Sequence, residues 1–183
     1  MQRTSHHSHR DDPISWSVAT PTFTCDAVVP GPFQGDFPAG AVDWSRFDDV
    51  VSLTAEEIPE VRLEVGGIWM HVPIWDDEMV NPAGVRAAAR TVSERVTAGR
   101  RVLVHCQAGL NRSGVISARA LMFMGLPVVE AIARVRSARG PFALSNPGFV
   151  AWLHEEAEAD VPQSRAAPGR PPCPSRPRSR TER

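Results

Sequence analysis

The chain has 183 residues and a formal net charge of −1, with 20 basic and 21 acidic side chains. This length suits one domain with a sizeable core, and the balanced charge gives no general attraction to nucleic acid or to a membrane surface. The only cysteines, Cys25, Cys106 and Cys173, are unclustered, which argues against a disulfide scaffold and against a thiolate zinc site.

The two terminal segments lack the pattern of folded elements. Residues 1–21 are polar, and residues 161–183 are rich in Pro, Arg and Ser with few apolar side chains. Such segments cannot offset the loss of chain entropy, so we expect a flexible tail at each end and one folded domain over residues 22–160. Because no apolar run has membrane-spanning length and no signal peptide is visible, we expect a cytoplasmic protein without membrane attachment.

Short strands are predicted in the first half of the domain. Pro30-Gly31-Pro32 marks a turn, and Val28, Val29 and Phe33 beside it favour a short strand. The apolar run at residues 48–53 predicts a buried strand. Two further strand-like runs, residues 61–65 and 68–74, lie on either side of a glycine pair.

Helices are predicted in the second half. Asn81 and Pro82 suit the N-cap and the first residue of a helix that ends near Gly99. Three further helices are expected over residues 113–124, over residues 127–139, and after Ser145 or Asn146. The side chains expected to face the core are Val85, Ala88, Ala89, Val92, Val96, Val128, Ile132, Val135, Phe149, Val150, Trp152 and Leu153.

A buried strand is predicted between the first two of these helices. Val102, Leu103 and Val104 form a continuous apolar run, as in a central strand covered on both faces. Strands mixed with helices indicate an α/β domain with a central, mainly parallel sheet flanked by helices.

The residues that follow this strand, from His105 to Gly114, read His-Cys-Gln-Ala-Gly-Leu-Asn-Arg-Ser-Gly. A loop between a strand and a helix N-terminus presents backbone N–H groups and the helix dipole to an anion. The N–H donors and Arg112 would favour the thiolate of Cys106. A buried, inert cysteine is the plainer interpretation of Cys106, but the whole string in this position favours a phosphate site. The residues expected to line the phosphate are Gln107, Ala108, Gly109, Leu110, Asn111 and Arg112.

These residue types suit phosphate-ester cleavage without a metal ion or another cofactor. Cys106 would be the nucleophile, and Arg112 could hold two phosphoryl oxygens and follow them into the transition state. Ser113 could hydrogen-bond the sulfur and ease its departure when the thiophosphate intermediate is hydrolysed. Gly109 would relieve crowding where the backbone bends around the anion.

The string from His105 to Gly114 resembles the signature loop of the protein tyrosine phosphatase superfamily, specifically its compact dual-specificity branch. Individually weaker similarities, spread over most of residues 28–153, are Pro30-Gly31, Gly35-Asp36, Val50-Val51-Ser52-Leu53 and Asn146-Pro147-Gly148-Phe149. The resemblance implies a protein tyrosine phosphatase-like fold and a cysteinyl-phosphate intermediate on Cys106. It also implies that Arg112 clamps the phosphate and that His105 is a buried residue supporting the thiolate.

The departing oxygen needs a proton, and the same group can later activate water. Residues 73–78, Pro-Ile-Trp-Asp-Asp-Glu, follow a predicted strand and precede a helix, as a mobile loop carrying the acid should. The family's acid is the aspartate of a Pro-x-x-Asp string, which Asp76 matches at 30 positions before Cys106. Asp77 stays open as the second candidate, and Glu78 as the third. We interpret Trp75 as a core anchor rather than a lid residue, and Trp69 as structural.

The preferred function is a protein phosphatase acting on phosphotyrosine, phosphoserine or phosphothreonine, with a phosphorylated protein as partner and no stable nucleic-acid binding. Asn111-Arg112 also resembles the loop of RNA 5′-phosphatases, so an RNA 5′-phosphate, a nucleotide or another non-protein phosphate is the alternative substrate. A non-catalytic phosphate-binding module is a further alternative, although it predicts loss of the nucleophile, the clamp or the acid. The oligomeric state and a redox role of Cys25 stay open.

Overall fold

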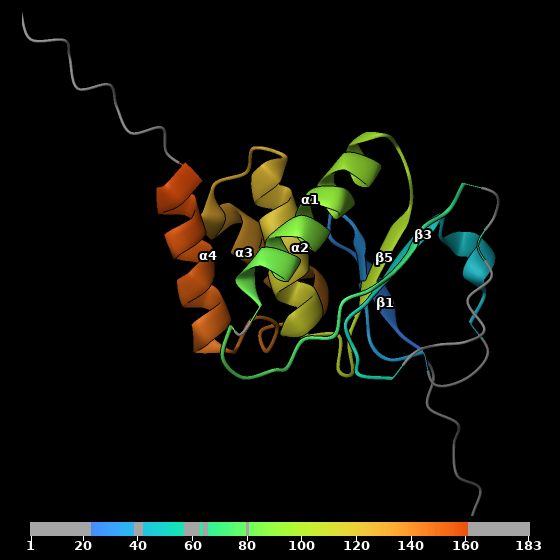
Figure 1. The fold of residues 1–183 in the computed structure, drawn as a ribbon, viewed down its shortest axis with the longest axis horizontal. Helices are drawn as coiled ribbons and strands as arrows, with labels where there is room; N and C mark the ends of the chain where they lie inside the picture. The colour runs from blue at the N-terminus through green and yellow to red at the C-terminus, as the bar shows by residue number, and fades with distance from the viewer. Residues whose placement is uncertain (1–22, 39–41, 57–62, 64–65, 80, 161–183) are drawn as a thin grey trace, which may run out of the picture.

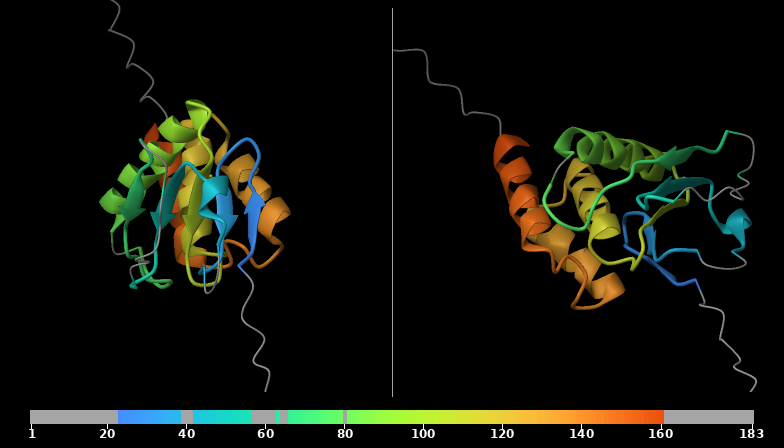
Figure 2. Two further views of the ribbon diagram at one scale, coloured as in Figure 1. Left: turned by 90° about the vertical axis from the view of Figure 1, so that its right-hand side faces the viewer. Right: turned by 60° about the horizontal axis from the view of Figure 1, so that its bottom comes forward.

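The structure, a computed structural model, describes residues 23–38, 42–56, 63, 66–79 and 81–160. The two expected tails lie outside these residues, as does most of the strand expected over residues 61–65. Within the described part, a five-stranded sheet carries four helices on one of its faces (Figures 1 and 2).

The sheet is mainly parallel, as the sequence predicted. Its strands are β1 (Cys25–Ala27), β2 (Phe33–Gly35), β3 (Asp49–Ser52), β4 (Trp69–His71) and β5 (Val102–His105). They are ordered β1-β2-β5-β3-β4, and only the β1–β2 pair is antiparallel among these described strands. The central strand is β5, and all four of its residues are buried. One strand differs slightly from expectation, since β1 ends at Ala27, one residue before the Val28-Val29 pair.

The helices begin close to their predicted starts. They are α1 (Pro82–Thr97), α2 (Arg112–Phe123), α3 (Val128–Arg139) and α4 (Pro147–Asp160), with a short 3-10 turn, η1, at Trp44–Arg46. The Asn81 side chain caps α1 by accepting a hydrogen bond from the Gly84 N–H at 2.9 Å. Asn146 caps α4 in the same way, accepting from the N–H groups of Gly148 and Phe149 at 2.9 and 3.3 Å.

The core lies between the helical layer and the sheet, and most of the side chains expected there are buried. The three that are only partly buried are Val96, Val128 and Val150. The interpretation of Trp75 as a core anchor is wrong, because 72% of its surface is exposed. Trp75 lies in the loop beyond β4, where its neighbour Ile74 packs against the core instead. Trp69, on the edge strand β4, stacks on the His71 ring with centroids 5.7 Å apart.

A buried carboxylate joins β3 to the end of α1. The Asp49 side chain is fully buried, and it accepts hydrogen bonds from Arg95 at 2.5 and 2.8 Å and from Arg100 at 2.8 and 3.1 Å. Burial alone would raise the pKa of Asp49, but the hydrogen bonds from the two guanidinium groups hold it well below its usual range.

Asp49→Asn is therefore expected to lower the free energy of unfolding at pH 7 by about 1.5 to 3 kcal/mol, the range for hydrogen bonds to charged groups. Because the folded pKa lies below the unfolded value, this stability is present above about pH 4 and is lost as the pH falls through the folded pKa. Urea unfolding at pH 7 and pH 3 measures the effect, and the deficit of the variant should shrink at pH 3. An equal deficit at both pH values would contradict this account. Asp48→Asn is the matched control, since the Asp48–Arg101 pair is more exposed and should contribute less.

Candidate active site

The phosphate loop (residues 106–111) joins the central strand β5 to the N-terminus of α2. Cys106, at the end of the strand, has only 1% of its surface exposed. Its Sγ lies 3.3 Å from the Oγ of Ser113, which is fully buried in the first turn of α2. Gln107 and Ala108 are exposed, and Leu110 and Asn111 are half-buried. The strand, loop and helix therefore bring the expected nucleophile and the expected sulfur partner into contact.

Arg112 is the first residue of α2 and reaches toward the loop of residues 73–78. Its Nη1 lies 3.5 Å from the carbonyl oxygen of Ile74. Its Nε is buried and has no hydrogen-bond partner among the described residues. The Arg112 side chain therefore extends from the start of α2 to the loop that carries Asp76.

The phosphate loop is held from outside through its carbonyl groups. The Gln34 amide donates to the carbonyls of Gly109 at 3.0 Å and Leu110 at 3.4 Å, and Arg139 Nε donates to Gly109 at 3.1 Å. The carbonyl of Gln107 accepts from the Phe37 N–H at 3.2 Å. Since these carbonyls are directed to the scaffold, N–H groups of the loop are left to face an anion.

Gly109 is required by this close packing. Its φ of +66° is in the left-handed region, and a Cβ there would lie 2.7 Å from the backbone of both Gly35 and Asp36. Gly109 was predicted from the sequence, whereas the two supports of its carbonyl, Gln34 and Arg139, were not. The signal available for Gln34 was a polar residue inside a short strand, between Phe33 and Gly35.

His105, at the end of β5, is fully buried. Burial lowers its pKa to about 4, so its ring is neutral near pH 7. Neither ring nitrogen has a hydrogen-bond partner among the residues that the structure describes. His105 therefore adds no positive charge beside the phosphate loop at neutral pH.

The first acid of the Asp-Asp-Glu string lies against the phosphate loop. The Asp76 carboxylate accepts a hydrogen bond from Asn111 Nδ2 at 3.1 Å and another from Asn146 Nδ2 at 3.0 Å. Asp77 contacts Asn146 through its backbone carbonyl, which accepts a hydrogen bond from Asn146 Nδ2 at 3.0 Å. Within the described ranges, no hydrogen bond or ion pair involves the side chains of Asp77 and Glu78. The geometry thus distinguishes Asp76 from its neighbours.

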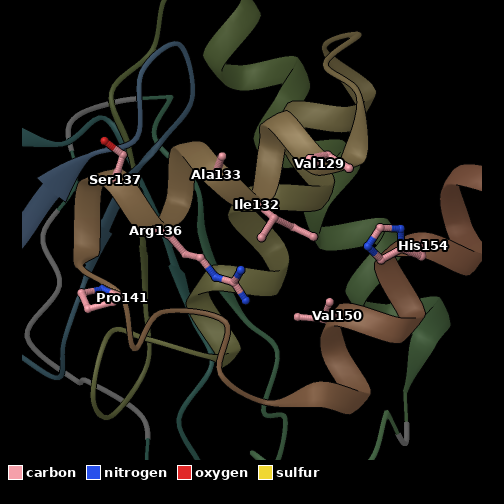
Figure 3. A pocket seen from close by; sticks show the side chains of 8 residues that line it. All are labelled: Val129, Ile132, Ala133, Arg136, Ser137, Pro141, Val150 and His154. Atoms are coloured by element: carbon pink, nitrogen blue, oxygen red, sulfur yellow. The ribbon is translucent and has the colours of Figure 1, made fainter.

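A cavity of about 470 Å³ lies beside the phosphate loop. Its lining residues are Asp76, Asp77, Glu78, Asn111, Ser145, Asn146, Pro147 and Gly148. A larger hollow, of about 750 Å³, lies between α3 and α4, where Ile132 and Val150 point toward each other (Figure 3). This second hollow is mostly apolar and contains none of the predicted site residues. The first cavity is lined by two of them, Asp76 and Asn111, but not by Cys106 or Arg112.

Cys25 is placed too far from Cys106 for a disulfide bond. Cys25 pairs with Gly35 on β2, and Gly35 pairs with His105 on β5. Two strand spacings amount to about 10 Å, whereas Cα atoms joined through a disulfide lie within about 7 Å. The sheet would have to rearrange before these two free thiols could be oxidised together.

The described part of the chain offers neither a metal-binding cluster nor a membrane-spanning helix. It contains no group of three or more His, Cys, Asp or Glu side chains placed to hold a metal ion. None of its helices has both the length and the apolar composition needed to cross a membrane.

Comparison with known proteins gives one family. The family model described as dual specificity phosphatase, catalytic domain, matches residues 47–159, which include both loops of the site. Among solved structures, the chain is similar to human DUSP28 at 27% identity, covering 73% of this chain and 96% of that chain with a TM-score of 0.61. It is also similar to Tk-PTP in the active form at 27% identity, with the same shares covered and a TM-score of 0.59. No curated protein sequence matches the chain.

Proposed function

The chain belongs to the dual specificity phosphatase family and is a cysteine-dependent protein phosphatase, and on this basis we propose that Cys106 is its nucleophile, Arg112 its phosphate clamp and Asp76 its general acid. The observation that carries the proposal is the contact of Asp76 with the phosphate loop, because it joins the acid to the strand end that holds the cysteine. The same contact supports Asp76 over Asp77.

In the first step, the Cys106 thiolate attacks phosphorus, so that an S–P bond forms while the bond to the departing oxygen breaks. Asp76 gives its proton to that oxygen, which leaves as the free hydroxyl group of the substrate protein. Arg112 binds two of the phosphoryl oxygens, and the N–H groups of the phosphate loop stabilise the charge that spreads over them.

In the second step, the Asp76 carboxylate takes a proton from water as that water attacks phosphorus. The S–P bond of the cysteinyl-phosphate breaks, inorganic phosphate leaves, and the sulfur departs as a thiolate. Ser113 Oγ is close enough, at 3.3 Å, to donate a hydrogen bond to this thiolate. The residues named in the two steps complete the cycle without a metal ion.

The substrate of this site is a phosphorylated protein carrying phosphotyrosine, phosphoserine or phosphothreonine. The loop positions Gln107, Ala108, Leu110 and Asn111 are uncharged, which suits a single phosphate monoester better than a highly anionic ligand. The RNA 5′-phosphatase alternative rests on Asn111-Arg112 alone, and no comparison favours it. Two free thiols in the described part of the chain fit a reducing compartment such as the cytoplasm.

Asp76→Ala is expected to lower kcat/KM by about 10² to 10⁴ on a phosphotyrosine peptide, the range for a positioned acid. The loss of kcat/KM should be smaller on p-nitrophenyl phosphate, whose leaving group departs more readily without a proton. Asp77→Ala is the matched control, since it removes a neighbouring carboxylate whose side chain makes no hydrogen bond within the described ranges. A large loss in Asp77→Ala, with Asp76→Ala nearly silent, would reverse the assignment.

A further inference from the structure

We propose that Asn111 is a positioning residue, which holds the Asp76 carboxylate against the phosphate loop for proton transfer. The inference rests on the role proposed above for Asp76. It gives Asn111 a task different from the phosphate contact expected from the sequence, because its side chain is directed to the loop of residues 73–78.

Both ends of the Asn111 amide are engaged. Its Nδ2 donates to Asp76 Oδ2 at 3.1 Å. Its Oδ1 accepts from the backbone N–H of Ser145 at 2.8 Å, from the Ser145 hydroxyl at 3.2 Å, and from the N–H of Asn146 at 3.2 Å. With its oxygen fixed by these donors, the planar amide can present only its NH₂ group to Asp76.

Asn146 holds the second oxygen of the same carboxylate. Its Nδ2 donates to Asp76 Oδ1 at 3.0 Å, while its Oδ1 caps the first turn of α4. Asn111 directly precedes α2, and Asn146 directly precedes α4. Two side chains anchored at helix starts therefore fix both oxygens of Asp76.

The two amide contacts, from Asn111 and Asn146, matter for proton transfer because Asp76 lies in an exposed loop. A free carboxylate there would sample many directions, whereas proton transfer requires it within about 2.6 to 3.2 Å of the departing oxygen. A carboxyl oxygen can accept more than one hydrogen bond, so the amide contacts leave a site for the proton. Asn111 does not touch the reacting atoms in this scheme and acts only through Asp76.

The test is a double-mutant cycle between Asn111→Ala and Asp76→Ala, with kcat/KM measured on phenyl phosphate and on p-nitrophenyl phosphate, because kcat/KM reports only the steps up to departure of the leaving group. In the otherwise unchanged enzyme, Asn111→Ala should lower kcat/KM on phenyl phosphate about 10- to 100-fold, the cost of a misplaced catalytic group. The loss of kcat/KM on p-nitrophenyl phosphate should be clearly smaller. In the Asp76→Ala background, Asn111→Ala should change kcat/KM little on either substrate.

Two further measurements separate positioning from damage to the loop. The rate at which iodoacetate alkylates Cys106 should be the same in Asn111→Ala as in the unchanged enzyme. Asn111→Asp keeps an oxygen for the N–H groups of Ser145 and Asn146 but cannot donate to Asp76 at neutral pH. Its loss of kcat/KM on phenyl phosphate should therefore be at least as large as that of Asn111→Ala.

The outcomes that overturn the proposal differ from those that overturn the proposed function. Equal losses from Asn111→Ala with and without Asp76, or equal losses on the two substrates, would mean that Asn111 acts on the phosphate loop itself. Slower alkylation of Cys106 in Asn111→Ala would also mean that Asn111 acts on the phosphate loop itself. Asp76→Ala with nearly full activity would instead remove Asp76 from the mechanism, and the role of Asn111 with it.

Discussion

Replacing Cys106 with serine is expected to abolish turnover, with kcat falling by about 10⁴-fold or more, as when a nucleophile is removed from a coupled catalytic group. A hydroxyl group holds its proton far more tightly than a thiol, so serine supplies almost no anionic nucleophile at neutral pH. Hydrolysis of p-nitrophenyl phosphate and of phosphopeptides, measured in the presence of EDTA, reports the loss. Because serine has nearly the shape of cysteine at this buried position, the variant should still bind phosphopeptides and retain protein substrates from a lysate.

Cys25→Ser is the matched control for this experiment. Burial is the main cause that raises the pKa of the Cys25 thiol, which makes it a poor nucleophile at neutral pH. Its replacement should leave kcat close to the starting value. Activity surviving in Cys106→Ser would overturn the mechanism.

Ser113→Ala should behave differently from both variants. It should release a rapid burst of one p-nitrophenol per enzyme before slow turnover, because the S–P bond still forms while its hydrolysis is slowed.

Replacing Arg112 with alanine is expected to lower kcat/KM by about 10³ to 10⁵, the range for an arginine that stabilises phosphoryl transfer. With His105 neutral at the end of β5, we expect the phosphoryl group to depend on the guanidinium group of Arg112. Arg112→Lys should recover only a small part of the loss, because an ammonium group cannot hold two oxygens in one plane. Steady-state kinetics on a phosphotyrosine peptide and on p-nitrophenyl phosphate measures both variants.

Arg134→Ala provides the comparison for Arg112. Arg134 lies on α3 and pairs with Glu130 at 3.0 Å, with both side chains about half exposed. Such a surface pair contributes little to stability, and kcat/KM should stay near its starting value. If Arg112→Lys retained most of the activity, a single positive charge would suffice and the two-oxygen clamp would be wrong.

The parts of the site predicted from the sequence are those with a local signal. The continuous apolar run of β5, the N-cap residues Asn81 and Asn146, and the cysteine-to-arginine spacing each lie within a short stretch of chain. The strand, helices and phosphate loop that follow from them are found where they were expected. Local patterns suffice here because strand burial, helix capping and loop spacing are properties of neighbouring residues.

The parts that were missed depend on pairing between distant segments. Gln34 supports Gly109 across 75 positions, and Asn111 meets Asp76 across 35. Neither contact leaves a periodic pattern in the sequence, since each arises from the order of strands in the sheet. The prediction that Trp75 is buried failed for a related reason. Its large apolar surface suggested burial, but the path of its loop exposes the side chain to solvent.

The outward direction of the phosphate-loop carbonyls affects which anions can compete for the loop. Because Gln34, Arg139 and the Phe37 N–H hold the loop in shape, it loses little conformational entropy when an anion binds. A preformed cradle of this kind does not distinguish strongly between the phosphoryl group of a substrate and inorganic phosphate. We therefore expect inorganic phosphate, which is the product, and other tetrahedral oxyanions to compete with the substrate for this rigid loop.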